Sequence, residues 1–320
     1  MLTETIAFES ADGATEIDAR LWMPDDGEPQ GIVQIVHGMA EHIDRYADFA
    51  GFLTEQGFGV CAESHIGHGK SAENADDLGY MPPDGKHILI DDVHMLRTAV
   101  QGAYDGIPYF IFGHSMGSFI TRVYLSRYGD GLTGAVICGT GNQPRAISEV
   151  GRALALALCR IRGPHYRSEL LDSMGAGGFG SSIEDARTGL DWLSTDPLVV
   201  DAYLADEMCG RMFTVGAYAT LLDLTGEAVT VECASAVPHA LPLLFIGGGQ
   251  DPVGDFGNGV LDAADLAERA GSEDVTIYIY EDMRHEILNE PRKSDVYRNV
   301  FDWMIERAHG NAPEKETWVV

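Results

Sequence analysis

The sequence predicts an α/β fold in which a mostly parallel central sheet is flanked by helices. Two observations carry this prediction. Short, nearly continuous apolar runs alternate with longer segments of helical periodicity, which is typical of parallel strands buried on both faces. The alternation is interrupted once, by a long stretch that contains helical patterns only. The apolar runs lie at 32–36, 58–62, 109–112, 134–138, 243–246 and 275–280.

The interruption divides the chain into segments. We expect the first part of the core at 1–141, a helical cap, or lid, inserted at 142–238, the second part of the core at 239–310 and a polar tail at 311–320. An insertion in this position is expected to cover the carboxyl ends of the strands, where open α/β sheets bind ligands.

The elements follow from local patterns. Residues 5–10 and 16–22 alternate apolar and polar side chains around a turn at 11–13, so we expect an antiparallel hairpin before the first buried strand. Apolar residues at helical spacing predict the helices, including three in the cap. The expected helices are 46–56, 89–100, 116–128, 147–161, 184–193, 199–208, 260–270 and 295–308.

The composition is ordinary for a globular protein except for its charge. Hydrophobic residues make up 45% of the 320 residues, enough for one large domain with an insertion. Lys and Arg number 21 against 50 Asp and Glu, and the net charge of −29 disfavours nucleic acid as a partner. The five cysteines are scattered, and no secretion signal or membrane-spanning run is recognisable. We therefore expect a cytoplasmic protein.

The serine at position 115 lies in a motif with a mechanical explanation. Gly113-His114-Ser115-Met116-Gly117 separates an apolar run from a helical segment, which is the layout of a nucleophile elbow. Glycine is expected at 113 and 117 because strand and helix pass too close for a side chain. The alternative is a serine in an ordinary tight turn.

A serine hydroxyl needs a base to take its proton, and the base needs a carboxylate to orient it. Asp251 follows the strand that ends at 246, and His285 follows the strand that ends at 280. Both are therefore expected at the same sheet edge as Ser115, in the chain order Ser, Asp, His of an α/β-hydrolase. Asp255 is the alternative acid. Asp251 as a turn residue and His285 as a loop histidine are the non-catalytic alternatives.

Backbone N–H groups must stabilise the oxyanion that forms on the substrate carbonyl. The residue after the nucleophile, Met116, is expected to supply one. We assign the other to Met39, in the His37-Gly38-Met39 loop after an earlier strand. His37 is interpreted as a brace of this loop and not as a proton acceptor.

Two further motifs are set aside. The glycine-rich segment 175–180 fits Gly-x-Gly-x-x-Gly, but no strand precedes it, so a hinge in the cap is favoured over a dinucleotide site. His65 and His68 have no carboxylate or cysteine cluster to complete a metal site. We expect neither a cofactor nor a metal.

In combination, these motifs resemble the monoacylglycerol lipase and lysophospholipase-like branch of the α/β-hydrolases, of serine aminopeptidase S33 type. Ser64 is a departure, because the family commonly has Asp before the His-x-Gly-His-Gly turn. The segments that carry the resemblance are Val36-His37-Gly38-Met39-Ala40-Glu41-His42 with Arg45-Tyr46, His65-Ile66-Gly67-His68-Gly69-Lys70-Ser71, Gly113-His114-Ser115-Met116-Gly117-Ser118, Asp251-Pro252-Val253-Gly254 and Arg284-His285-Glu286.

The resemblance implies an α/β-hydrolase fold and a serine carboxylester hydrolase that cleaves single-acyl-chain esters, of monoacylglycerol or lysophospholipid type, through an acyl-enzyme. It implies a small-molecule acyl ester as partner and at most transient contact of the cap with a membrane surface, and it leaves the oligomeric state open. The alternatives are a small-ester esterase, an amide or peptide hydrolase, and a non-catalytic binding protein of this fold. The implied site comprises Ser115, Asp251 and His285, the amides of Met39 and Met116, and supporting residues His37, Gly38, Gly113, His114 and Gly117.

Overall fold

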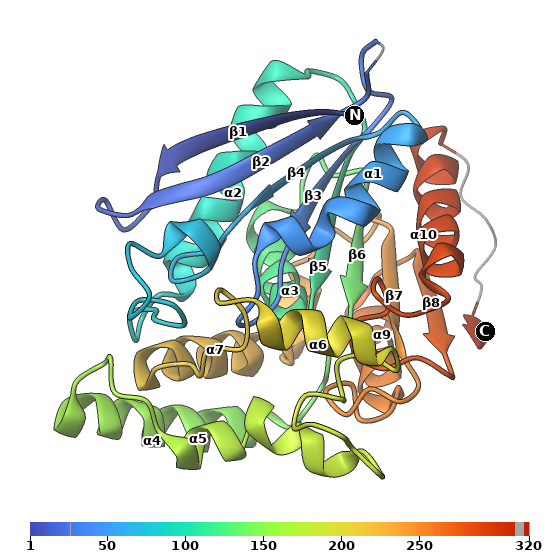
Figure 1. Cartoon of the computed structure of the whole chain (residues 1–320). Helices are drawn as coiled ribbons and strands as arrows, with labels where there is room; N and C mark the ends of the chain where they lie inside the picture. The colour runs from blue at the N-terminus through green and yellow to red at the C-terminus, as the bar shows by residue number, and fades with distance from the viewer. Residues whose placement is uncertain (26, 311–316, 320) are drawn as a thin grey trace.

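The computed structural model describes residues 1–25 and 27–310 and the backbone of 317–319. Within these residues nine strands form one sheet in the order β1-β2-β4-β3-β5-β6-β7-β8-β9 (Figure 1). The strands are β1 (Leu2–Glu9), β2 (Glu16–Met23), β3 (Ile32–Val36), β4 (Gly59–Glu63), β5 (Tyr109–His114), β6 (Gly134–Cys138), β7 (Leu243–Gly248), β8 (Val275–Tyr280) and β9 (Thr317–Val319).

The sheet is mostly parallel, which confirms the predicted fold class. β1 and β2 form the expected antiparallel hairpin, and β2 is also antiparallel to β4. From β4 to β9 every neighbouring pair is parallel. β9 pairs with β8 and belongs to the predicted 311–320 tail; residues 311–316 and 320 of that tail lie outside the described residues.

Helices cover both faces of the sheet (Figure 1). In the sequence, helices also lie between β6 and β7 and between β7 and β8. The α-helices are α1 (Ala47–Glu55), α2 (Lys86–Ala103), α3 (Met116–Tyr128), α4 (Arg145–Arg162), α5 (Glu169–Ser173), α6 (Pro197–Ala205), α7 (Val215–Ala228), α8 (Val231–Ser235), α9 (Asn258–Ala270) and α10 (Lys293–Ala308). Three 3₁₀ helices complete the list: η1 (Ile43–Tyr46), η2 (Gly69–Ser71) and η3 (Ala176–Ser182).

The apolar strands divide their side chains between two cores, because successive residues of a strand point to opposite faces. Phe110 and Phe112 of β5 pack in the core under α1 and α10, with Phe49 and Trp303. Ile111, between them, packs in the opposite core under α2, α3 and α9. Both faces are covered, which explains why these strands read as continuous apolar runs.

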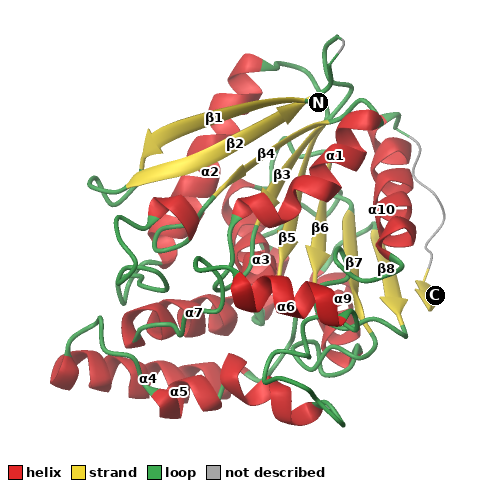
Figure 2. Ribbon diagram, in the orientation of Figure 1, coloured by secondary structure: helices red, strands yellow, loops and turns green. Residues whose placement is uncertain are grey.

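Helices α4 to α8 lie between β6 and β7 in the sequence. Figure 2 shows α4 to α7 beyond the arrowheads of β5 and β6, at the carboxyl end of the sheet. The predicted helix at 184–193 was wrong, because this segment consists of turns and bends. Its polar backbone groups bond outside the segment: Trp192 O and Leu193 O accept hydrogen bonds from the N–H groups of His285 and Glu286.

None of the described helices combines the length and apolar character that crossing a lipid bilayer requires.

Candidate active site

Ser115 lies at the sharp turn between β5 and α3. Its backbone has φ 54° and ψ −121°, a region that residues with a side chain rarely adopt. The turn is held from below, because the Ser115 N–H donates to Cys138 O of the neighbouring strand at 2.9 Å. Such strain persists only where the surroundings impose it, and here it directs the serine toward the carboxyl edge of the sheet.

The two glycines of the motif allow the close approach that produces this turn. A Cβ atom on Gly117 would lie 1.9 Å from Val36 O, at the end of β3. A Cβ atom on Gly113 would lie 2.4 Å from Gly117 O. Backbone atoms cannot yield at such distances, so the expectation that strand and helix pass too close for a side chain at these positions agrees with the geometry.

The structure brings His285 and Asp251 together at the same edge. His285 Nδ1 lies 2.8 Å from Asp251 Oδ2, and both side chains are buried. The second carboxylate oxygen, Oδ1, accepts the N–H of Val253 at 2.9 Å. With Nδ1–H donating to the carboxylate, Nε2 of the imidazole remains available as a proton acceptor. Asp255, the alternative acid, is exposed and has no hydrogen bond to His285.

Ser115 and His285 line one cavity of about 390 Å³, together with Met39 and Met116. Met116 is the first residue of α3, where backbone N–H groups have no partner within the helix. In the β3–η1 loop the Gly38 N–H donates to Glu41 Oε1 at 2.6 Å. The next amide, that of Met39, is not committed to any other described residue. Within the described residues neither amide therefore has a hydrogen-bond partner of its own.

His37 is fully buried behind this loop and has both ring nitrogens occupied. Its Nε2 accepts the N–H of His65 at 3.0 Å, and its Nδ1–H donates to Gly38 O at 2.8 Å. Burial, with the nearby His65 and His68, holds its pKa well below the usual range. A neutral ring with two backbone partners fits the predicted bracing role.

A charged network around Arg45, which the sequence patterns did not reveal, joins the loop of Met39 to the loop of His285. Arg45 donates two hydrogen bonds to the Glu286 carboxylate, at 2.5 and 2.7 Å, and a third to Glu41 Oε2 at 2.9 Å. Glu41 and Arg45 are four residues apart, a spacing that can indicate an ion pair. Glu286, however, is 241 residues away from Arg45. Buried charges are tolerated when they are paired in this way.

His114 connects this network to the loop of His285. Its Nδ1 lies 3.3 Å from Glu41 Oε1 and its Nε2 lies 3.3 Å from His285 O. The pKa of His114 is raised; burial works against the charged ring, but the hydrogen bond and charge of Glu41 outweigh it. Of the supporting residues named from the sequence, His114 therefore contacts the backbone of the candidate base.

The cavity walls are mainly apolar and come from both the core and the residues inserted between β6 and β7. The Trp192 ring lies against the His285 ring at a tilt of 47°, with centroids 5.1 Å apart, and no sequence pattern pointed to it. The segment 175–180 lies at the start of η3 and along this wall, with no strand before it. Apolar residues of the lining are Phe119, Ile147, Leu171, Met174, Phe179, Leu190, Trp192, Leu193, Leu221, Leu222, Val229 and Val253.

A second buried cluster lies behind the His37 loop, at residues 63–68. Glu63 is fully buried, and burial raises its pKa to about 8, with the charge of Asp92 adding to the effect. Its Oε1 lies 3.7 Å from His65 Nδ1, and neither atom has a hydrogen-bond partner among the described residues. Burial lowers the pKa of His65 to about 3. Near neutral pH both side chains are therefore expected to be uncharged.

Known proteins of similar sequence and structure cover almost the whole chain. A family model described as "Serine aminopeptidase, S33" matches residues 27–292. The monoacylglycerol lipase of Mycolicibacterium smegmatis is 29% identical over 294 residues, 92% of this chain and 94% of that protein. The monoglyceride lipase of Homo sapiens is 26% identical over 292 residues, covering 90% and 86%. A solved thermostable carboxyl esterase from Bacillus coagulans, in complex with glycerol, matches with a TM-score of 0.89 and 32% identity, covering 96% and 99%.

The raised pKa of Glu63 predicts how stability depends on pH. Between the usual carboxyl value of 4.5 and about 8 the folded protein holds a proton that the unfolded chain releases, so stability falls as pH rises through this window. We expect Glu63→Gln to remove this loss and to exceed the wild type in free energy of unfolding by about 1–3 kcal/mol at pH 8. The advantage should shrink toward pH 5.

Urea unfolding at both pH values measures this difference. Glu16→Gln, at an exposed position of β2, is the matched control and should leave the pH dependence unchanged. A Glu63→Gln protein that loses stability between pH 5 and 8 as steeply as the wild type would contradict the prediction.

Proposed function

The chain belongs to the serine aminopeptidase S33 family of hydrolases, and on that basis we propose that it is a serine carboxylester hydrolase acting through an acyl-enzyme. The observation that carries the proposal is the 2.8 Å contact between His285 Nδ1 and Asp251, on the wall of a cavity that His285 shares with Ser115. A protein that only binds a ligand has no use for an oriented imidazole in the same cavity as a strained serine.

In the proposed mechanism His285 Nε2 takes the proton of the Ser115 hydroxyl as Oγ attacks the ester carbonyl carbon. The oxyanion that forms accepts hydrogen bonds from the amides of Met39 and Met116. His285 then gives the proton to the leaving alcohol as the C–O bond breaks, which leaves an acyl-enzyme. A water molecule attacks the acyl carbonyl by the same route and releases the acid. Asp251 remains ionised and stabilises the imidazolium that forms in both halves.

The proposed substrate is an ester with a single acyl chain, with monoacylglycerol favoured over lysophospholipid. The apolar walls suit a hydrocarbon chain. The polar part of the lining carries three carboxylates, Glu41, Asp172 and Glu286, against one guanidinium, Arg211. Because Arg45 pairs with Glu41 and Glu286, the wall offers no surplus of positive charge to a phosphate group, while its carboxylate oxygens can accept hydrogen bonds from the hydroxyl groups of glycerol. The relatives named monoacylglycerol lipase support the same choice.

We place the protein in the cytoplasm and propose that it contacts lipid surfaces only transiently, through α4. All five cysteines are free, as expected in a reducing compartment. Val150 and Ile161 of α4 are 70% and 76% exposed and lie on one stripe of the helix. The helix also carries four arginines against one glutamate, in a chain of net charge −29. A basic amphipathic helix of this kind is suited to lie at an interface, while the acidic remainder of the protein limits its stay there.

The proposed chemistry predicts that Ser115 is the single reactive serine. A fluorophosphonate should label the wild type at one site per chain, and Ser115→Ala should abolish labelling and lower ester turnover by at least about 10⁴-fold. Intact-mass spectrometry and a chromogenic ester assay measure both effects. Ser126→Ala, on α3 and outside the cavity, is the control, and it should keep both the labelling and the ester turnover. Full labelling of Ser115→Ala would refute the proposed nucleophile.

The cavity predicts the order of substrates. Monoacylglycerols with medium or long chains should have a kcat/KM at least about 10-fold above those of diacylglycerols, lysophospholipids and aminoacyl amides. A diacylglycerol carries a second acyl chain, a lysophospholipid carries a phosphate-containing headgroup, and an aminoacyl amide has an amide bond and neither a fatty acyl chain nor glycerol. A panel at equal concentration below KM tests this order. Faster release from aminoacyl amides would favour the peptidase alternative.

The α4 stripe predicts a difference between dissolved and lipid-bound substrate. Val150→Ser and Ile161→Ser, neither of which lines the cavity, should slow hydrolysis of monoacylglycerol in phosphatidylcholine vesicles at least about threefold. Turnover of a soluble short-chain ester should not change. Leu261→Ser, on α9 and 40% exposed, is the matched control. Equal rates on vesicles for all three variants and the wild type would contradict this contact.

A further inference from the structure

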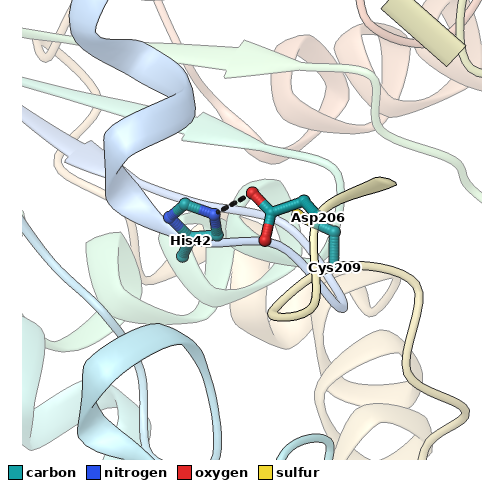
Figure 3. A group of neighbouring side chains, drawn as sticks. All are labelled: His42, Asp206 and Cys209. Carbon is teal, nitrogen blue, oxygen red and sulfur yellow. Dashed lines mark hydrogen bonds and ion pairs between the residues drawn. The ribbon is translucent and has the colours of Figure 1, made fainter. Parts of the chain in front are cut away.

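Three potential metal ligands meet outside the cavity, at residues that the proposed reaction does not use. His42 Nε2 lies 2.9 Å from Asp206 Oδ2 (Figure 3). His42, Asp206 and Cys209 each offer one ligand atom, and these three atoms lie within 4.8 Å of one another. His42 and Cys209 are buried, whereas the Asp206 side chain is 31% exposed. The group thus has two enclosed ligands and one that faces solvent, which leaves an entry path for an ion.

The backbone on both sides of this group is fixed by other interactions. His42 directly precedes η1, and Asp206 directly follows α6. Ala40 O accepts hydrogen bonds from Gly210 N–H at 2.9 Å and from Tyr203 OH at 2.8 Å, so the two loops are joined without any ion. Asp206 Oδ1 accepts the N–H of Met208 at 2.9 Å, which aims Oδ2 at His42. The ligands are therefore held near one another before an ion binds.

The charges around the group favour a cation. Negative charge comes from Asp206, Glu41 and Glu286. Positive charge comes from Arg45, which is paired with both glutamates. A divalent ion would offset this carboxylate charge.

We propose that His42, Asp206 and Cys209 form a binding site for a zinc-like divalent ion, with water as the fourth ligand. Nitrogen, oxygen and sulfur donors in one set suit Zn²⁺, which accepts all three in a tetrahedral arrangement. At usual Zn²⁺ bond lengths of about 2.0–2.3 Å the ligand atoms must approach to roughly 3.3–3.8 Å of one another, so Cys209 must move inward by about 1 Å.

The binding step balances with the loss of one proton. In the bound state the imidazole of His42 carries its proton on Nδ1, so that Nε2 can bind the ion in place of its hydrogen bond to Asp206. The Cys209 thiol loses its proton to solvent and binds as thiolate. The ion then joins the loop of Met39 to the end of α6. This inference does not depend on the proposed reaction.

Cobalt titration of the tag-free protein tests the site directly. Co²⁺ bound to a thiolate in a tetrahedral site gives a sulfur-to-cobalt absorption band and intense visible bands, and Zn²⁺ should displace it. We expect one Co²⁺ per chain in the wild type. Cys209→Ser should abolish the sulfur band, and His42→Ala or Asp206→Asn should weaken binding at least about 10-fold. Cys159→Ser, which removes a half-buried free thiol elsewhere, should bind as the wild type does.

A second measurement guards against variants that fold poorly. Zn²⁺ should raise the melting temperature of the wild type and of Cys159→Ser but not that of Asp206→Asn, whose polar side chain keeps the shape of the native one. Calorimetry in buffers of different ionisation enthalpy should give about one proton released per Zn²⁺. Absence of the sulfur band in the wild type, or its persistence in Cys209→Ser, would overturn the proposal.

Discussion

The close contact between the start of α3 and the end of β3 determines the geometry of the whole site. Because a side chain at Gly117 would meet Val36 O at 1.9 Å, the helix can approach this strand only through glycine. The same approach places Gly38 beside Ser115: a Cβ on Gly38 would lie 3.0 Å from Ser115 Cβ. One packing constraint therefore sets the strained turn and the distance from the serine to the Met39 loop. It also places the positive end of α3, which begins at Met116, at the cavity wall.

Charge compensation is the second constraint, because the site is buried. Glu41 and Glu286 are both buried, and Arg45 pairs with both while joining the loop of Met39 to the loop of His285. Behind the loop of Met39 no charge is needed, because the neutral ring of His37 satisfies two backbone groups. An unpaired charge at either place would cost several kcal/mol. The hydrogen bonds and ion pairs that satisfy these buried polar groups thus also hold the loops in place.

The sequence carried the parts of the site that depend on local pattern. Ser115, Asp251 and His285 each follow an apolar strand, and parallel strands bring such positions to one edge whatever the rest of the chain does. The parts that depend on distant partners were not predictable. The segment 184–193 looks helical, but its last two residues accept backbone hydrogen bonds from the loop of His285. His42 and Asp206 are 164 residues apart, and no periodicity relates them. β9 consists of Thr317, Trp318 and Val319, residue types that favour strands, but three residues do not reveal that their partner is β8.

The residues inserted between β6 and β7 contact the core unevenly, and this bears on how a substrate reaches Ser115. Near His285 the contact is firm: Arg284 donates to Asp191 O at 2.6 Å, in addition to the backbone bonds of Trp192 and Leu193. Near Met39 the contact runs through Tyr203 and Gly210. These anchors hold the wall closest to the candidate catalytic groups. By contrast Ile147 of α4 and Met174 after α5 line the cavity while remaining 55% and 64% exposed. Ile147 and Met174 thus join the cavity lining to the solvent-exposed surface, away from the anchored wall.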